Sequence, residues 1–241
     1  MKERSKYTGF NRTKVLFAFN LVFVAVIAGN VVRGAEADTS DSENVRTVLF
    51  FGDSLTSGYN IDLGDAYPAI IGDKLRENGL SCRVVNAGLS GETTAGGLRR
   101  VDWILRREID VFVLALGGND ALRGFDPKTT RENLKTILER VRERYPDALL
   151  VLAGMRAPPN MGNDYTNAFA AIYPDLAEEL DLPLIPFLLE GMAVDPEYNL
   201  DDLIHPNERG HRVIAETVWE TLEPLLRKEE QGDRNESGAS P

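Results

Sequence analysis

The chain has 241 residues, with 27 lysines and arginines against 38 aspartates and glutamates, so its formal net charge at pH 7 is −11. A protein this acidic repels nucleic-acid phosphates, which argues against a nucleic-acid partner. Its single cysteine, Cys82, cannot form an intrachain disulfide or a cysteine zinc site. We therefore expect its stability to depend on a hydrophobic core.

The N-terminal residues have the composition of a targeting segment. Five basic residues between Lys2 and Lys14 precede an apolar stretch, residues 15–29, that is interrupted only by Asn20. Ala35 and Ala37 then offer a small-x-small cleavage site. This order predicts a secretory signal peptide over residues 1–37 and an exported protein, periplasmic or secreted, with an uncleaved N-terminal membrane anchor as the alternative.

The remaining residues suit one domain. We predict a linker over residues 38–45, the domain over 46–227 and a polar, disordered tail over 228–241. Short apolar runs that read as buried strands alternate with amphipathic segments along the domain. The expected strands lie at residues 48–51, 83–85, 111–116, 149–153 and 184–187.

Two of the amphipathic segments are clear helices. One places Leu134, Ile137 and Val141 on a single face, and either Thr129 or Thr130 can cap its start. The last helix is expected to begin near Pro206. Strict alternation of strands and helices predicts a parallel sheet covered on both faces, with the functional site at the carboxyl ends of the strands.

A serine follows the first expected strand, and an acid and a histidine stand three residues apart near the end. Ser54 belongs to a Gly-Asp-Ser-Leu sequence at 52–55, and Asp202 precedes His205. A hydroxyl is a poor nucleophile until a base takes its proton and an acid holds that base in place. The only other histidine, His211, falls within the last helix, and we interpret it as a surface or packing residue.

The loops after the second and third strands offer donors for a developing oxyanion. The first is glycine-rich, with Gly88 and Gly91, and the second contains Asn119 after two glycines. The backbone N–H groups of Ser54 and of one loop glycine, with the Asn119 amide, suit an acyl-transfer site.

These four blocks, in this order, resemble the SGNH (GDSL-type) hydrolases across the domain. Residues 117–125, 172–174, 182–187 and 202–207 look closest to the multifunctional thioesterase/lysophospholipase/arylesterase branch. The resemblance implies that Ser54 is the nucleophile, His205 the base and Asp202 its orienting acid. It further implies an oxyanion hole made of Ser54, Gly91 and Asn119.

Gly91 is preferred to Gly88 because the family's Ser-Gly-Asp-Thr pattern matches residues 90–93. Glu92 replaces the family's aspartate there, and we assign it no role. The resemblance implies a flavodoxin-like, three-layer α/β/α sandwich with a five-stranded parallel sheet and no cofactor or metal.

We therefore expect a serine esterase that hydrolyses carboxylic esters or thioesters, including aryl esters and lysophospholipids, with transient contact with lipid surfaces as a further expectation. The alternatives are a carbohydrate acetyl-esterase and a non-catalytic glycan-binding module on the same fold. A weaker one is a divalent-cation site made by Asp53, Asp120 and Asp202, although Asp53 and Asp120 more simply fix loop geometry. The glycines at 91–97 lack the Lys-Ser/Thr ending of a phosphate-binding loop.

Overall fold

A computed structural model describes residues 45–237 of the chain. The predicted signal peptide, all but the last residue of the predicted linker, and the last four residues of the chain lie outside the described residues. Within residues 45–237, no helix combines the length and the apolar character needed to cross a membrane.

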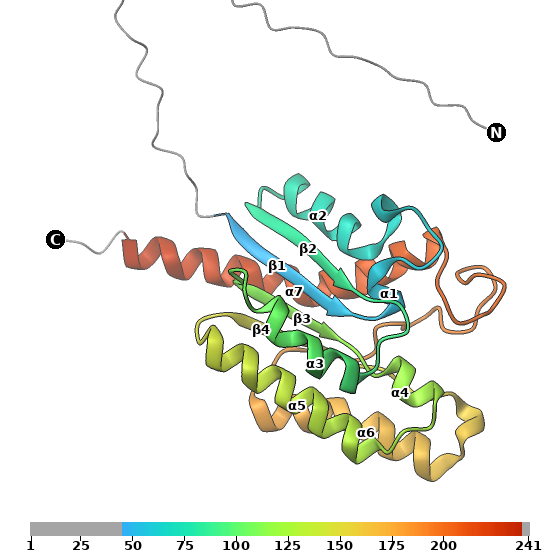
Figure 1. The fold of residues 1–241 in the computed structure, drawn as a ribbon. Helices are drawn as coiled ribbons and strands as arrows, with labels where there is room; N and C mark the ends of the chain where they lie inside the picture. The colour runs from blue at the N-terminus through green and yellow to red at the C-terminus, as the bar shows by residue number, and fades with distance from the viewer. Residues whose placement is uncertain (1–44, 238–241) are drawn as a thin grey trace, which may run out of the picture. The chain divides into compact units, whose positions relative to one another are not determined.

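The described residues form a five-stranded sheet in which every neighbouring pair of strands is parallel (Figure 1). Its order, β2-β1-β3-β4-β5, is the flavodoxin-like doubly wound order. The strands are β1 (Arg46–Gly52), β2 (Cys82–Gly88), β3 (Val111–Ala115), β4 (Leu149–Ala153) and β5 (Leu184–Ile185). The predicted sheet is confirmed.

Four strands differ in length from the prediction, since β1 begins two residues earlier and ends one residue later, and β3 ends one residue earlier. β2 continues past Val85 to Gly88, because its polar last residues pair with the end of β1, where Gly88 lies opposite Gly52. β5 stops at Ile185, two residues before the expected end. The next residue, Pro186, has no N–H with which to extend the ladder.

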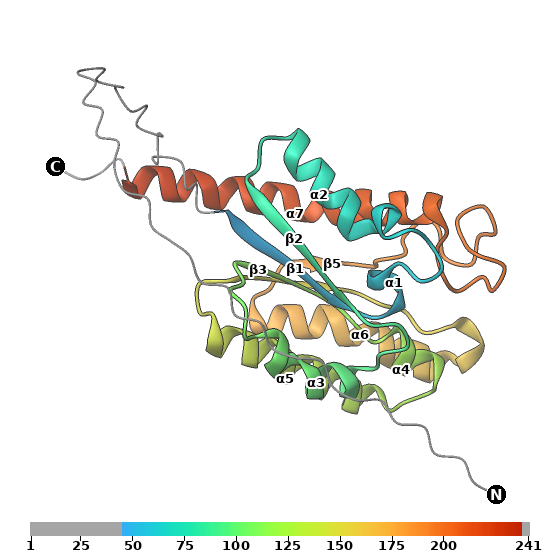
Figure 2. The ribbon, with the colours of Figure 1, turned by 45° about the horizontal axis from the view of Figure 1, so that its top comes forward.

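Helices cover both faces of this sheet. The longer ones are α2 (Tyr67–Glu77), α3 (Thr94–Ile104), α5 (Pro127–Arg144), α6 (Asn163–Leu180) and α7 (Glu208–Ser237). Figures 1 and 2 show α2 and α7 on one face and α3, α5 and α6 on the other. The predicted three-layer α/β/α sandwich is therefore confirmed. Two short helices, α1 (Ser54–Ser57) and α4 (Gly118–Leu122), follow β1 and β3 directly.

The starts of two helices depend on caps that the sequence analysis did not choose. Asp126, rather than Thr129 or Thr130, caps α5, and its carboxylate accepts from the N–H groups of Lys128 and Thr129, both at 3.3 Å. Pro127 follows it in the first turn, where a missing N–H costs nothing. α7 begins at Glu208 because the Asn207 side chain accepts from the second and third N–H groups of that helix.

The prediction of a disordered tail from residue 228 is wrong for residues 228–237, which continue α7. The helix packs its buried Leu226 against the core. Arg46, at the start of β1, donates to the Leu226 carbonyl and pairs with Glu229 at 3.0 Å and Glu230 at 3.4 Å. These contacts join residues 226–230 to the sheet, a tertiary interaction that the local polar composition does not reveal.

His211 is a packing residue, as the sequence analysis expected. Its side chain is 1% exposed, its Nδ1 accepts from the Tyr67 N–H at 3.1 Å, and the two rings are stacked. Burial lowers the pKa of His211 to about 4, and the nearby Glu208 carboxylate opposes this effect. The imidazole therefore joins α7 to the start of α2 in its neutral form.

Acid should destabilise the fold through His211. Since its pKa is near 6.5 in the unfolded chain and about 4 in the folded one, the unfolded chain binds the proton first as the pH falls. The stability that neutral His211 contributes is fully present above pH 6.5 and is lost towards pH 4, by about 3 kcal/mol in total. His211→Asn keeps an acceptor for Tyr67 but cannot titrate. Urea unfolding across this pH range should show a steeper loss for the unmodified protein, and equal slopes would contradict the assignment.

Candidate active site

Ser54 is presented by a tight strand-turn-helix connection. β1 ends at Gly52, and the Asp53 side chain caps α1 by accepting from the Leu55 N–H at 3.0 Å. A Cβ at Gly52 would lie 2.0 Å from Thr56 Oγ1, so only glycine lets the helix turn back this closely. The Ser54 N–H belongs to the first turn of α1, where a helix has no partner for it.

His205 and Asp202 lie in a loop that hydrogen bonds hold in one shape. Asn199 and Pro206 form an antiparallel bridge, and the Leu200 N–H donates to the His205 carbonyl at 2.7 Å. The buried Asn199 amide donates to the carbonyls of Met192 and Asp195. Sequence reasoning missed Asn199, because its partners come from the preceding loop.

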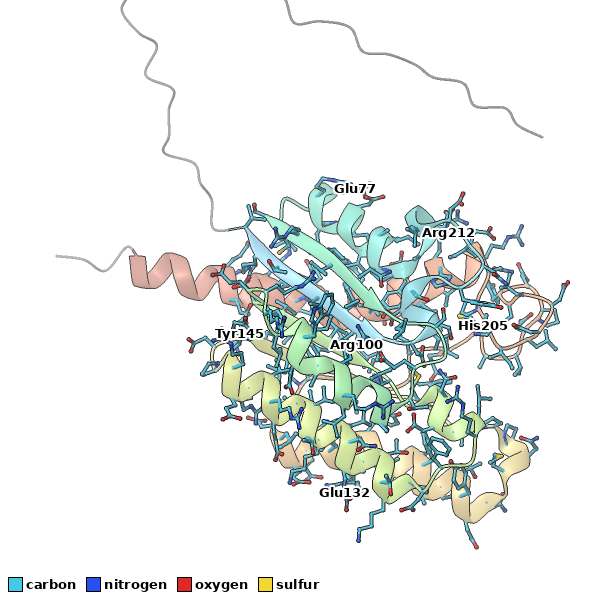
Figure 3. The ribbon with its side chains drawn as sticks, in the orientation of Figure 1. Glu77, Arg100, Glu132, Tyr145, His205 and Arg212 are labelled. Carbon is cyan, nitrogen blue, oxygen red and sulfur yellow. The ribbon has the colours of Figure 1, made fainter. Side chains whose placement is uncertain are left out.

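The structure brings Ser54, His205 and Asp202 into one hydrogen-bonded chain. His205 Nε2 lies 3.0 Å from Ser54 Oγ, and His205 Nδ1 lies 2.7 Å from Asp202 Oδ2. The ring of Tyr59 packs against the imidazole, with centroids 4.4 Å apart. Figure 3 shows His205 on the side towards which the strands point, so the three groups meet at the carboxyl-end edge of the sheet.

Asp202 is electrostatically suited to hold the imidazole. Partial burial raises the pKa of its carboxyl group, but the hydrogen bonds from the His205 backbone and ring and from the Ile204 N–H outweigh this effect and lower it to about 2. Asp202 is therefore ionised near neutral pH, and its carboxylate accepts a hydrogen bond from the N–H at His205 Nδ1. That tautomer leaves Nε2 as the acceptor for the Ser54 hydroxyl.

The three predicted oxyanion donors occupy different elements at this edge. Asn119 lies in the first turn of α4, and its Nδ2 donates one hydrogen to Asp53 Oδ2 at 3.2 Å, which leaves the second for another acceptor. Gly88 donates its N–H to Asn86 Oδ1 at 2.9 Å. Gly91 lies further along the loop at φ +76°, and its carbonyl accepts from Arg123. Of the two loop glycines, Gly91 thus suits an oxyanion better.

Asp53 orients Asn119 as a buried carboxylate. Burial raises the pKa of Asp53 to about 6, and hydrogen bonds from the Leu55 N–H and from Asn119 partly offset this. Above that pH the carboxylate can only accept, so the amide nitrogen of Asn119, rather than its oxygen, faces Asp53. The orientation of the amide is thereby fixed.

Asp53, Asp120 and Asp202 do not form a common metal site. Asp120 accepts from the Thr94 N–H at 2.9 Å and from the Thr94 hydroxyl, Asp53 faces Asn119, and Asp202 faces His205. Among residues 45–237, no group of three or more histidine, cysteine, aspartate or glutamate side chains is placed to hold a metal ion. Asp53 and Asp120 fix loop geometry, as the sequence analysis expected.

Comparison with known proteins identifies the family. The profile of the GDSL-like Lipase/Acylhydrolase family matches residues 50–213. The chain belongs to this family. It is accordingly a carboxylic ester hydrolase of the SGNH type, which confirms the resemblance drawn from the four sequence blocks.

Individual relatives cover most of the chain. "Thioesterase 1/protease 1/lysophospholipase L1" of Escherichia coli (strain K12) is 39% identical over 212 residues, which is 88% of this chain and 95% of the relative. An arylesterase of Vibrio mimicus is 37% identical and covers 75% of this chain and 90% of its own. The crystal structure of AlinE4, a SGNH-hydrolase family esterase, is 42% identical with a TM-score of 0.63, over 75% of this chain and 96% of that one.

The family's glycine loop has an internal anchor here that sequence reasoning missed. Glu92, which replaces an aspartate of the SGNH pattern, is 7% exposed and forms a two-pronged ion pair with Arg100 of α3. Arg100 also donates to the Ala87 carbonyl at 2.9 Å and lies over the Phe51 ring. The loop that carries Gly91 is thus tied to β2 and α3. In the sequence, the only sign of this ion pair is that Glu92 and Arg100 stand eight residues apart.

Glu92→Gln should destabilise the protein by about 2–4 kcal/mol, because it leaves the partly buried guanidinium of Arg100 without a counter-charge. The matched control is Glu139→Gln, since Glu139 is exposed and pairs with Lys135 at 3.7 Å; we expect it to change stability by less than about 0.5 kcal/mol. Urea unfolding of both variants measures the difference. Equal effects would show that the buried pair does not anchor the loop.

Proposed function

We propose that Ser54, His205 and Asp202 hydrolyse carboxylic esters and thioesters through an acyl-enzyme on Ser54. The observation that carries the proposal is the unbroken chain from Ser54 Oγ through His205 to an ionised Asp202. This arrangement argues against a non-catalytic glycan-binding module, which has no use for an activated hydroxyl.

In the first half-reaction, Ser54 Oγ attacks the carbonyl carbon while His205 Nε2 takes the hydroxyl proton. The carbonyl oxygen becomes negative, and the N–H groups of Ser54 and Gly91 with the Asn119 amide stabilise it. Collapse of this intermediate breaks the bond to the alcohol or thiol, and the His205 imidazolium returns the proton to the leaving group. Asp202 stabilises the imidazolium throughout.

In the second half-reaction, water takes the place of the alcohol or thiol. His205 removes a proton from the water as it attacks the acyl carbon, the same donors stabilise the second oxyanion, and Ser54 Oγ leaves with the proton from His205. The carboxylic acid is released. No step requires a cofactor.

For substrates, we propose small aryl and acyl esters, thioesters and lysophospholipids. Support comes from the relatives, whose names include thioesterase, lysophospholipase and arylesterase at 37–39% identity. The acidic surface of the protein gives no comparable support for a nucleic-acid partner.

Ser54→Ala and His205→Ala should each lower kcat for p-nitrophenyl acetate by roughly five orders of magnitude while the circular dichroism spectrum stays unchanged. Matched controls exist within the chain. Ser81→Ala changes a serine beyond the opposite end of the sheet, and His211→Asn changes the other histidine; both should retain turnover. Full activity in pure Ser54→Ala protein would refute the assignment of the nucleophile.

A double-mutant cycle tests the coupling of Asn119 to Asp53. Asn119→Ala should lower kcat by about 10²–10³ with little change in KM, because it removes an oxyanion donor. In Asp53→Asn the new amide can donate as well as accept, so the Asn119 amide is no longer held in one orientation. This variant should therefore lower kcat in the same way as Asn119→Ala. The double variant should then lose no more than Asn119→Ala alone. Losses that multiply would mean that Asp53 acts independently of Asn119.

We also propose export to the periplasm or beyond, on the strength of the basic, apolar and small-residue order at the N-terminus. Mass spectrometry of the protein recovered after cell fractionation measures this. The expected product lacks residues 1–37. A full-length product in the membrane fraction would contradict cleavage and indicate an anchor.

A further inference from the structure

Exposed apolar side chains gather around Ser54. Within residues 45–237, ten large hydrophobic side chains are exposed, and six of them belong to segments that border the site. They are Tyr59, Leu89, Leu122, Phe125, Leu203 and Ile204, each 38–51% exposed. We call these six the apolar collar. Such clustering of exposed apolar side chains around one site is typical of an apolar contact surface.

Contacts between the segments show that they lie next to one another around the site. Tyr59 packs on His205, which Leu203 and Ile204 immediately precede. The Leu89 N–H donates to the Gly52 carbonyl at 3.0 Å, two residues before Ser54. Arg123, next to Leu122, donates to the Gly91 carbonyl at 3.0 Å and so joins the loop that carries Leu89 to the loop that carries Leu122 and Phe125.

The charges on these segments select the kind of surface. Residues 59–62, 89–91, 122–125 and 200–205 contain three carboxylates, namely Asp62, Asp201 and Asp202, against a single cation, Arg123. An anionic membrane attracts lysine and arginine, and these segments contain no lysine. The surface that suits these segments is a lipid surface with an apolar interior and head groups that carry no net charge.

We propose that the apolar collar inserts into the surface of a zwitterionic lipid aggregate, micelle or bilayer, and thereby presents Ser54 to acyl esters held there. The physical basis is the transfer of six partly exposed apolar side chains out of water. The catalytic consequence rests on the proposed function of Ser54, whereas the docking itself does not.

A flotation assay tests the docking without catalysis. The full chain with Ser54→Ala is mixed with vesicles of phosphatidylcholine, or of equal parts phosphatidylcholine and phosphatidylglycerol. Adding Leu89→Ser and Leu122→Ser should lower partitioning onto phosphatidylcholine at least about tenfold. The matched control is Val45→Ser with Trp103→Ser, since these side chains are 51% and 57% exposed on other segments; it should change partitioning less than about twofold.

All these proteins carry the same N-terminal residues, so a difference in vesicle partitioning between them is caused by the substituted side chains. Equal partitioning of the collar variant and the control would overturn the proposal, and so would stronger binding of the parent protein to the anionic vesicles. Sedimentation tests the other occupant: a dimer that the collar variant dissociates would show that the collar joins two copies of this chain instead.

Turnover with an intact Ser54 separates docking from acyl-group binding. The collar variant should retain hydrolysis of monomeric p-nitrophenyl acetate and lose hydrolysis of lysophosphatidylcholine above its critical micelle concentration. Equal losses on both substrates would assign the collar to the acyl pocket and overturn the docking. An unmodified protein inactive on both, with collar-dependent vesicle binding intact, would contradict only the proposed function.

Discussion

The site depends on three neighbouring strands that end at the same level. Gly52 lies opposite both Gly88 and Ala115, so the connections after β1, β2 and β3 leave the sheet side by side. In a parallel sheet all these connections share one edge. All three predicted oxyanion donors, Ser54, Gly91 and Asn119, come from these connections, and only the Asp202–His205 pair comes from elsewhere in the chain. A change of register in any strand would therefore move a donor away from Ser54.

Buried polar groups near the site hold the loops that follow these strands and fix the orientation of the catalytic side chains. Asp53 caps α1 and orients Asn119, Asp120 holds the start of α3 through Thr94, and Glu92 with Arg100 anchors the glycine loop. Each of these acids has low exposure and a donor for its oxygens. Such groups are costly to bury without a partner. They favour a single arrangement of the loops and so preorganise the oxyanion donors.

The rim of the site has the opposite character. Its side chains are apolar and partly exposed, and its charges are mostly acidic. The buried polar groups and the apolar collar thus have separate tasks. The polar groups position the donors that stabilise charge during the reaction, and we propose that the collar contacts the lipid surface that holds the substrate.

The sequence alone determined the order of strands and helices, the doubly wound class, and the site residues that follow the first three strands, because hydrophobic periodicity and short motifs are local signals. It selected Ser54, Asp202 and His205 by type and spacing. It failed at Asn199, at the Glu92–Arg100 pair and at residues 228–237, where the decisive partners are remote or eight residues away. Only the tertiary structure decided the tautomer of His205 and the orientation of the Asn119 amide, and it supported the choice of Gly91 that the sequence pattern had made. Each of these depends on which hydrogen-bond partners the folded chain brings within reach.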